Sequence, residues 1–107
     1  MNDLDYVLCY LPAKERDAIL LLAYHMALAY RYDEQGKVIL AQRRWSTYRE
    51  VVRNTQATPA MTERAHRIAC SKSIKDLPFD ELYDKLIKAL ARTGAQRMAA
   101  VVVPFRG

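Results

Sequence analysis

The sequence is poor in glycine, with three in 107 residues, and it contains only two cysteines. It has no glycine-rich phosphate loop and no glycine-rich turn that would present a nucleophilic serine. Cys9 and Cys70 are isolated and form no CxxC motif, which predicts free thiols and a reducing, cytoplasmic location. The start, MNDLDY, lacks the basic region of a signal peptide. No apolar run reaches the roughly 20 residues that a membrane span requires.

Zinc ligands with suitable spacing are also scarce. His66 and Cys70 are four residues apart, which on a helix places both on one face, as in half of a zinc site. Cys9 and His25 would have to supply the other two ligands, but they are not a spaced pair, and both belong to apolar segments. We therefore predict that the chain holds no zinc.

Acidic residues that could hold magnesium occur in one place only. Asp80 and Asp84 form an i, i+4 pair with Glu81 beside them, but no second acidic cluster is available to share a metal ion. A solvated helix face with acids near its positive end is the simpler interpretation. With no metal, no cofactor and no paired nucleophile and base, we predict that the protein is not an enzyme.

The chain does contain one long apolar stretch, at residues 17–32, which reads DAILLLAYHMALAYRY. Its leucines, alanines and methionine favour a helix, and β-branched residues are nearly absent. Pro12 suits the first turn of a helix and Gly36 suits its end. We predict a central helix over about 12–33. Because a helix that is apolar all round must be covered on most sides, we also predict a homodimer.

The remaining segments predict further helices around the central one. Apolar spacing and capping residues indicate helices over 2–10, 38–55, 59–71 and from Pro78 to about Gly94. The fold class is therefore all-α, with four to five helices packed around the helix at 12–33 in a single domain, 1–107. Residues 95–107 form a possible C-terminal arm, and Val101, Val102 and Val103 could add one short strand.

One stretch leaves a second interpretation open. Residues 30–44, YRYDEQGKVILAQRR, resemble the strand pair that opens many Nudix hydrolases, with DEQG as the turn. The glycine, glutamate and arginine box that defines that family is absent, so the family is rejected. A hairpin over about 27–43 remains an alternative to two helices.

Charge is distributed unevenly along the chain. Residues 1–36 carry three basic and six acidic side chains, whereas residues 37–75 carry nine basic and two acidic ones. A concentration of one sign raises the expectation of an anionic partner. On helices at 38–55 and 59–71 the arginines fall away from the apolar stripes. The candidate nucleic-acid-binding residues are Arg43, Arg44, Arg49, Arg53, Arg64, Arg67, Lys72 and Lys75.

The resulting hypothesis is a small non-enzymatic nucleic-acid-binding or regulatory protein. Arginine among hydroxyl and amide side chains suits contact with phosphates, and no group is placed to read bases. The alternative is a protein-protein interaction module, a small subunit or an inhibitor in a larger complex. In that case the basic residues would meet an acidic protein surface.

Overall fold

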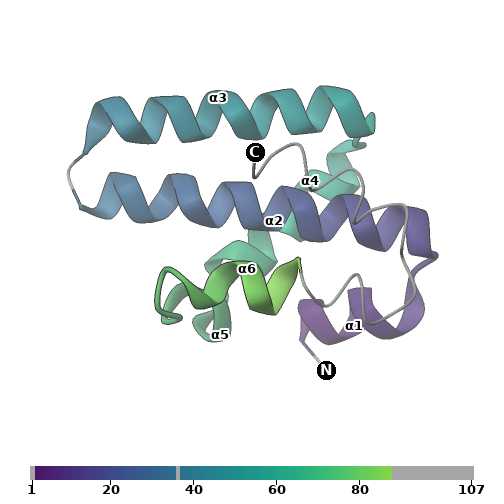
Figure 1. The fold of residues 1–107 in the computed structure, drawn as a ribbon. Coiled ribbons are helices and arrows are strands. Elements are labelled where there is room, and N and C mark those ends of the chain that lie inside the picture. Colours follow the sequence, from purple (N-terminus) through teal and green to yellow (C-terminus); the bar gives the residue numbers. More distant parts are fainter. Residues whose placement is uncertain (1, 36, 88–107) are drawn as a thin grey trace.

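The computed structural model describes residues 2–35 and 37–87, and in this part the chain is helical. Figure 1 shows how the helices are arranged. Their bounds are α1 (Asp3–Tyr10), α2 (Ala13–Glu34), α3 (Val38–Thr55), α4 (Pro59–Cys70), α5 (Lys72–Lys75) and α6 (Glu81–Leu86). The predicted all-α fold with a central apolar helix is confirmed.

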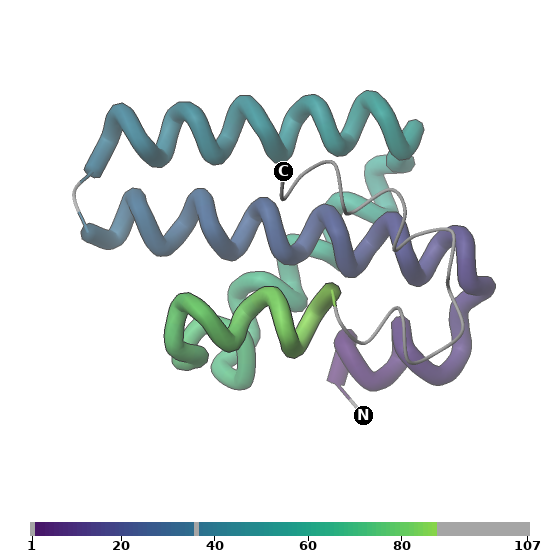
Figure 2. Tube along the Cα trace, in the orientation of Figure 1, coloured from purple at the N-terminus to yellow at the C-terminus, as the bar shows by residue number. Residues whose placement is uncertain are grey.

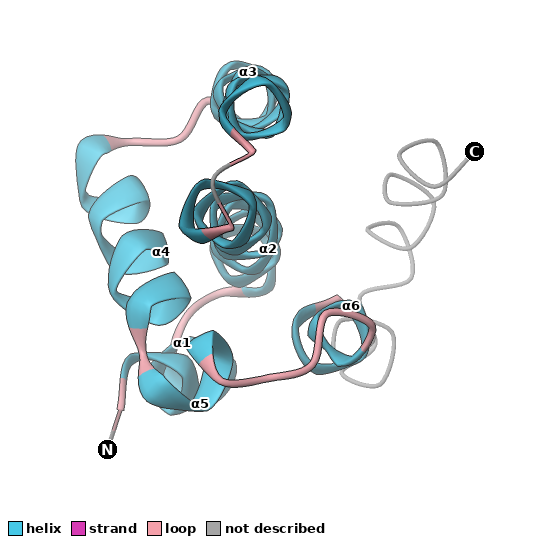
Figure 3. Cartoon of the chain, turned by 90° about the vertical axis from the view of Figure 1, so that its left-hand side faces the viewer, coloured by secondary structure: helices cyan, strands magenta, loops and turns pink. Residues whose placement is uncertain are grey.

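The α2 helix is the centre of the fold. It lies between α3 on one side and α5 and α6 on the other, while α4 runs along a third side (Figures 1 and 3). Every residue from Ala18 to Ala29 is buried except Tyr24, which is half-buried. Full burial of each large aliphatic side chain contributes roughly 1.5–3 kcal/mol. The neighbouring helices thus cover the apolar side chains that this stretch carries all round the helix.

The α3 helix runs back beside α2 (Figure 2). Its buried contacts come from the carboxyl-terminal half, where Tyr48 and Val51 are 6% and 0% exposed. Its first turn is different, because Val38 is 57% exposed, and Ile39 and Leu40 beside it are 71% and 37% exposed. The first turn of α3 therefore presents apolar side chains to solvent.

Helix boundaries follow from local capping. The Thr58 hydroxyl accepts a hydrogen bond from the Met61 N–H at 3.2 Å, and Pro59 occupies the first turn of α4. At the end of α3, Gln56 adopts the left-handed region with φ of 53°, where the chain turns toward α4. These residues set the sharp connection that lets α4 pack on α2.

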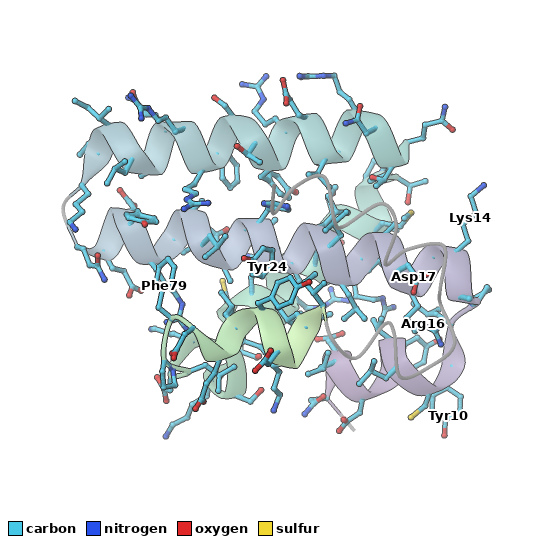
Figure 4. All side chains as sticks on the ribbon, in the orientation of Figure 1. Tyr10, Lys14, Arg16, Asp17, Tyr24 and Phe79 are labelled. Carbon is cyan, nitrogen blue, oxygen red and sulfur yellow. The ribbon has the colours of Figure 1, made fainter. Side chains whose placement is uncertain are left out.

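Aromatic pairs join α2 to α6 and to the turn that precedes α6. Tyr24 meets Tyr83 edge to face with ring centroids 5.9 Å apart, and Tyr32 meets Phe79 at 5.6 Å. Figure 4 shows Tyr24 and Phe79 at this junction. Edge-to-face pairs of this kind add about 0.5–1.5 kcal/mol beyond burial. They hold α6 against a helix whose other sides are covered by α3 and α4.

Some sequence-based expectations were wrong in detail. The hairpin alternative is contradicted, because residues 27–34 and 38–43 are helical. The connection after α4 contains a short helix, α5, that the pattern did not indicate. The helix expected from Pro78 begins at Glu81 and is described to Leu86. Its expected continuation to Gly94, the arm at 95–107 and the strand option at Val101–Val103 lie outside the described residues.

Within residues 2–35 and 37–87, no helix combines the length and the apolar character that crossing a membrane demands.

Candidate nucleic-acid interface

Three of the predicted arginines lie on the solvent-facing side of α3. Arg43, Arg49 and Arg53 are all exposed, and Gln42 and Ser46 on the same helix are exposed with them. Arg43 and Arg53 are ten residues apart, which is about 15 Å along a helix axis. These three arginines, called the α3 arginines below, form a row of guanidinium groups that can meet a chain of phosphates.

One carboxylate lies within this row. Glu50 approaches Arg53 with an Oε1 to Nη2 distance of 3.8 Å, and both side chains are about two-thirds exposed. Exposed ion pairs contribute little, typically 0–1 kcal/mol, and salt screens them. Arg53 therefore remains available to an anionic ligand.

Arg44 has a different role. It is half-buried, and its guanidinium lies over the Tyr32 ring at 5.2 Å from the centroid. The Lys37 ammonium lies over the same ring at 6.0 Å. A cation over an aromatic face is worth about 0.5–1 kcal/mol at an exposed site. Arg44 thus contributes to the packing of α3 on α2.

Arg64 and Arg67 of α4 are both engaged by Asp3 of α1. Arg64 Nη1 lies 3.5 Å from Asp3 Oδ1, and Arg67 Nε donates to Asp3 Oδ2 at 3.2 Å. Arg67 Nη1 also donates to Glu63 at 3.0 Å, and the Arg64 guanidinium lies 4.5 Å from the Tyr6 ring centroid. These contacts join α1 to α4 and neutralise part of the predicted basic surface.

Lys72 and Lys75 of α5 are exposed, but they occupy another part of the molecule. The α5 and α3 helices lie on opposite sides of α2 (Figures 1 and 3). The structure therefore divides the eight predicted residues into separate groups. The α3 arginines form the largest of these groups on one helix, with three exposed members.

Two polar residues of α2, Asp17 and His25, are buried. Asp17 is 1% exposed and lies 3.4 Å from the Nε of Arg16, near the junction with α1 (Figure 4). His25 is 5% exposed, and its ring meets Tyr24 edge to face at 5.1 Å. Burial lowers the pKa of His25 to about 4, and repulsion by Arg44 adds to the effect. His25 is therefore a neutral imidazole at pH 7.

His66 and Cys70, the pair on α4 with the spacing of metal ligands, lie beside Tyr30 of α2. His66 Nδ1 lies 2.7 Å from the Tyr30 hydroxyl oxygen, and His66 Nε2 lies 3.8 Å from Cys70 Sγ. The i, i+4 spacing of His66 and Cys70 indicated their proximity, whereas nothing in the sequence indicated Tyr30. In the described part of the chain, no three side chains of the His, Cys, Asp and Glu types gather closely enough to hold a metal ion.

Comparison of the chain with protein-family models, with curated proteins and with solved structures finds no match.

Proposed function

We propose that the protein is a small, cytoplasmic, non-enzymatic nucleic-acid-binding or regulatory protein, and that the α3 arginines are its contact surface. The observation that supports this proposal is the exposed row of Arg43, Arg49 and Arg53 on one helix face. Guanidinium groups bind phosphates with paired hydrogen bonds and keep their charge at any physiological pH. The row contains no cluster of aromatic or amide groups that would read bases, so binding is expected to be independent of sequence.

The test measures how binding to duplex DNA depends on salt. Each phosphate contact adds about −0.9 to the slope of log affinity against log salt. The R49Q/R53Q variant should flatten this slope by about 2 and weaken binding to all sequences equally. Because both side chains are exposed, the melting temperature should stay unchanged.

The matched control removes the same charge from the other side of the molecule. The K72Q/K75Q variant also loses two positive charges, but from α5. Its salt slope should stay near that of the wild-type protein. Equal losses in both variants would indicate attraction by net charge alone. No binding of wild-type protein to DNA or RNA at about 20 mM salt would contradict the proposal.

A second candidate function, the protein-interaction module, is favoured by the exposed first turn of α3. Val38, Ile39 and Leu40 form a contiguous apolar patch that solvent reaches. Acidic Asp33 and Glu34 precede this patch and basic Lys37 and Arg43 adjoin it. A surface with both signs of charge beside an apolar centre can pair with its own copy about a two-fold axis. We therefore propose a second copy of this chain as the occupant.

Light scattering at micromolar concentration tests this pairing. Wild-type protein should have the mass of two chains, and I39E should have the mass of one, because a buried unpaired carboxylate is costly. Ala60→Glu introduces the same charge at an exposed position on α4 and should remain a dimer. A wild-type mass of one chain would exclude the homodimer.

A further inference from the structure

Tyr30, His66 and Cys70 form a thiol–imidazole–hydroxyl cluster that DNA binding does not use. Tyr30 comes from α2, whereas His66 and Cys70 are one turn apart on α4. The imidazole lies between the other two groups, with 2.7 Å from Nδ1 to the tyrosine oxygen and 3.8 Å from Nε2 to the cysteine sulfur. A nucleophile beside a base that a third group orients is the arrangement found in covalent catalysis.

Aromatic contacts fix the position of the hydroxyl in this cluster. The Tyr30 ring stacks on Trp45 with centroids 6.3 Å apart and 22° between the planes, and Trp45 packs on Tyr48 at 4.8 Å. The His66 ring meets Tyr30 edge to face at 89°. The ring of His66 is thus held by both a hydrogen bond and a packing contact, which directs Nε2 toward Cys70.

The hydroxyl of Tyr30 is compatible with the imidazole before and after proton transfer. When His66 is neutral, its Nδ1–H can donate to the hydroxyl oxygen, and Nε2 is then free to accept the thiol proton. When His66 is protonated, Nδ1–H still donates to the hydroxyl and Nε2–H donates to the thiolate. Burial raises the pKa of Tyr30, and the neighbouring Cys70 and Tyr48 raise it further, so the hydroxyl stays neutral.

Charged groups also lie around the sulfur. A cavity of about 120 Å³ beside Cys70 is lined by Arg31, Glu34 and Lys75 as well as Tyr30. Arg31 donates from Nη2 to the carbonyl oxygens of Ile74 and Lys75 at 2.7 and 3.2 Å, which anchors the guanidinium there. Two cations and one carboxylate thus line this cavity.

Cys70 is the last residue of α4, one turn after His66. The imidazole of His66 is the base that lies beside its thiol, so replacement of His66 should have a large effect on the reaction.

We propose that Cys70 is an activated thiol and a site of modification by low-molecular-weight disulfides. The thiol proton passes to His66 Nε2, and the thiolate attacks one sulfur of the disulfide. A new S–S bond forms between Cys70 and that sulfur as the original S–S bond breaks. The other half leaves as a thiolate and takes up the proton from His66, so the exchange needs no further oxidant or reductant.

The chain provides its own comparison thiol. Cys9 on α1 is exposed like Cys70. In the part of the chain that the structure describes, no hydrogen bond joins its sulfur to an imidazole. The two thiols are both exposed, but only Cys70 has an imidazole beside it in the described part of the chain. A difference in their reactivity therefore measures the effect of the base and not the effect of exposure.

The experiment uses glutathione disulfide as the probe and mass spectrometry of the full chain as the readout. The C9S protein retains Cys70 and the C70S protein retains Cys9. At pH 6.5, where about 1% of an ordinary thiol is ionised, C9S should form the mixed disulfide roughly tenfold faster than C70S. The difference should narrow at pH 8.5, where about half of an ordinary thiol is ionised.

Two further variants identify the base and the positioning residue. C9S/H66Q should react at the rate of C70S at pH 6.5, and it should fold, because His66 is exposed. C9S/Y30F should shift the pH–rate profile toward that of C70S without abolishing the reaction. If Tyr30 had only a structural role, its replacement would not shift this profile. Equal rates for C9S and C70S, or a rate unaffected by H66Q, would overturn the proposal.

Discussion

His25 shows how a single side chain can link the stability of the fold to pH. Its imidazole lies in the most buried part of α2, and burial together with Arg44 lowers its pKa from 6.5 to about 4. The unfolded chain takes up a proton near pH 6.5, whereas the folded chain does so only near pH 4. Between these values the unfolded state binds more protons, so protonation favours unfolding.

We therefore expect the free energy of unfolding to be fully maintained above about pH 6.5 and to fall as the pH decreases toward 4. The loss should approach about 3 kcal/mol and level off below pH 4. Denaturant titrations at several pH values measure it. In H25L this part of the pH dependence should disappear, whereas H66Q, at an exposed histidine, should retain it. An unchanged pH dependence in H25L would assign the effect to other groups.

At the scale of the element, α1 depends on polar contacts for its position. Leu4 and Val7 are buried, but the helix has only eight residues, and an isolated helix of that length is marginal in water. Asp3 adds two contacts, one with Arg64 and one with Arg67. Its side chain is 33% exposed, so these ion pairs are partly screened by solvent.

Replacing Asp3 by asparagine should weaken this attachment. We expect D3N to lower the free energy of unfolding by about 0.5–1 kcal/mol more than D5N, a control that also removes an acid from the first turn of α1. The difference should shrink in about 1 M salt. Thermal or denaturant unfolding measures it, and equal effects of D3N and D5N would show that the ion pairs add nothing.

The elements also show which features of the fold a sequence pattern can predict. Apolar spacing and prolines gave α2, α3 and α4 close to their observed bounds, because these signals are local. The exposure of Val38 and Ile39 was not predictable in the same way. Periodicity identifies an apolar face, but whether another helix is long enough to cover that face depends on tertiary packing.

For the whole molecule, the charge pattern along the chain is only partly preserved in space. The basic middle third suggested one basic surface from Arg43 to Lys75, yet Arg64 lies against the acidic Asp3, 61 residues away. The lysines of α5 are also separated from the α3 arginines by α2 (Figure 3). Helix periodicity places a residue on a face of its own helix. It does not show which faces of different helices meet. The candidate interface therefore contains the residues of α3 and not those of α4 and α5.

Trp45 gives the molecule an intrinsic optical signal at a useful position. It is the single tryptophan of the chain, and it packs between Tyr30 of α2 and Tyr48 of its own helix. Its fluorescence therefore reports the separation of α3 from α2, while α1 contributes tyrosine emission only, from Tyr6 and Tyr10. Because Tyr30 is also hydrogen-bonded to His66, and His66 lies beside Cys70, the same fluorophore is three contacts from the Cys70 thiol and can follow its chemistry without an added dye.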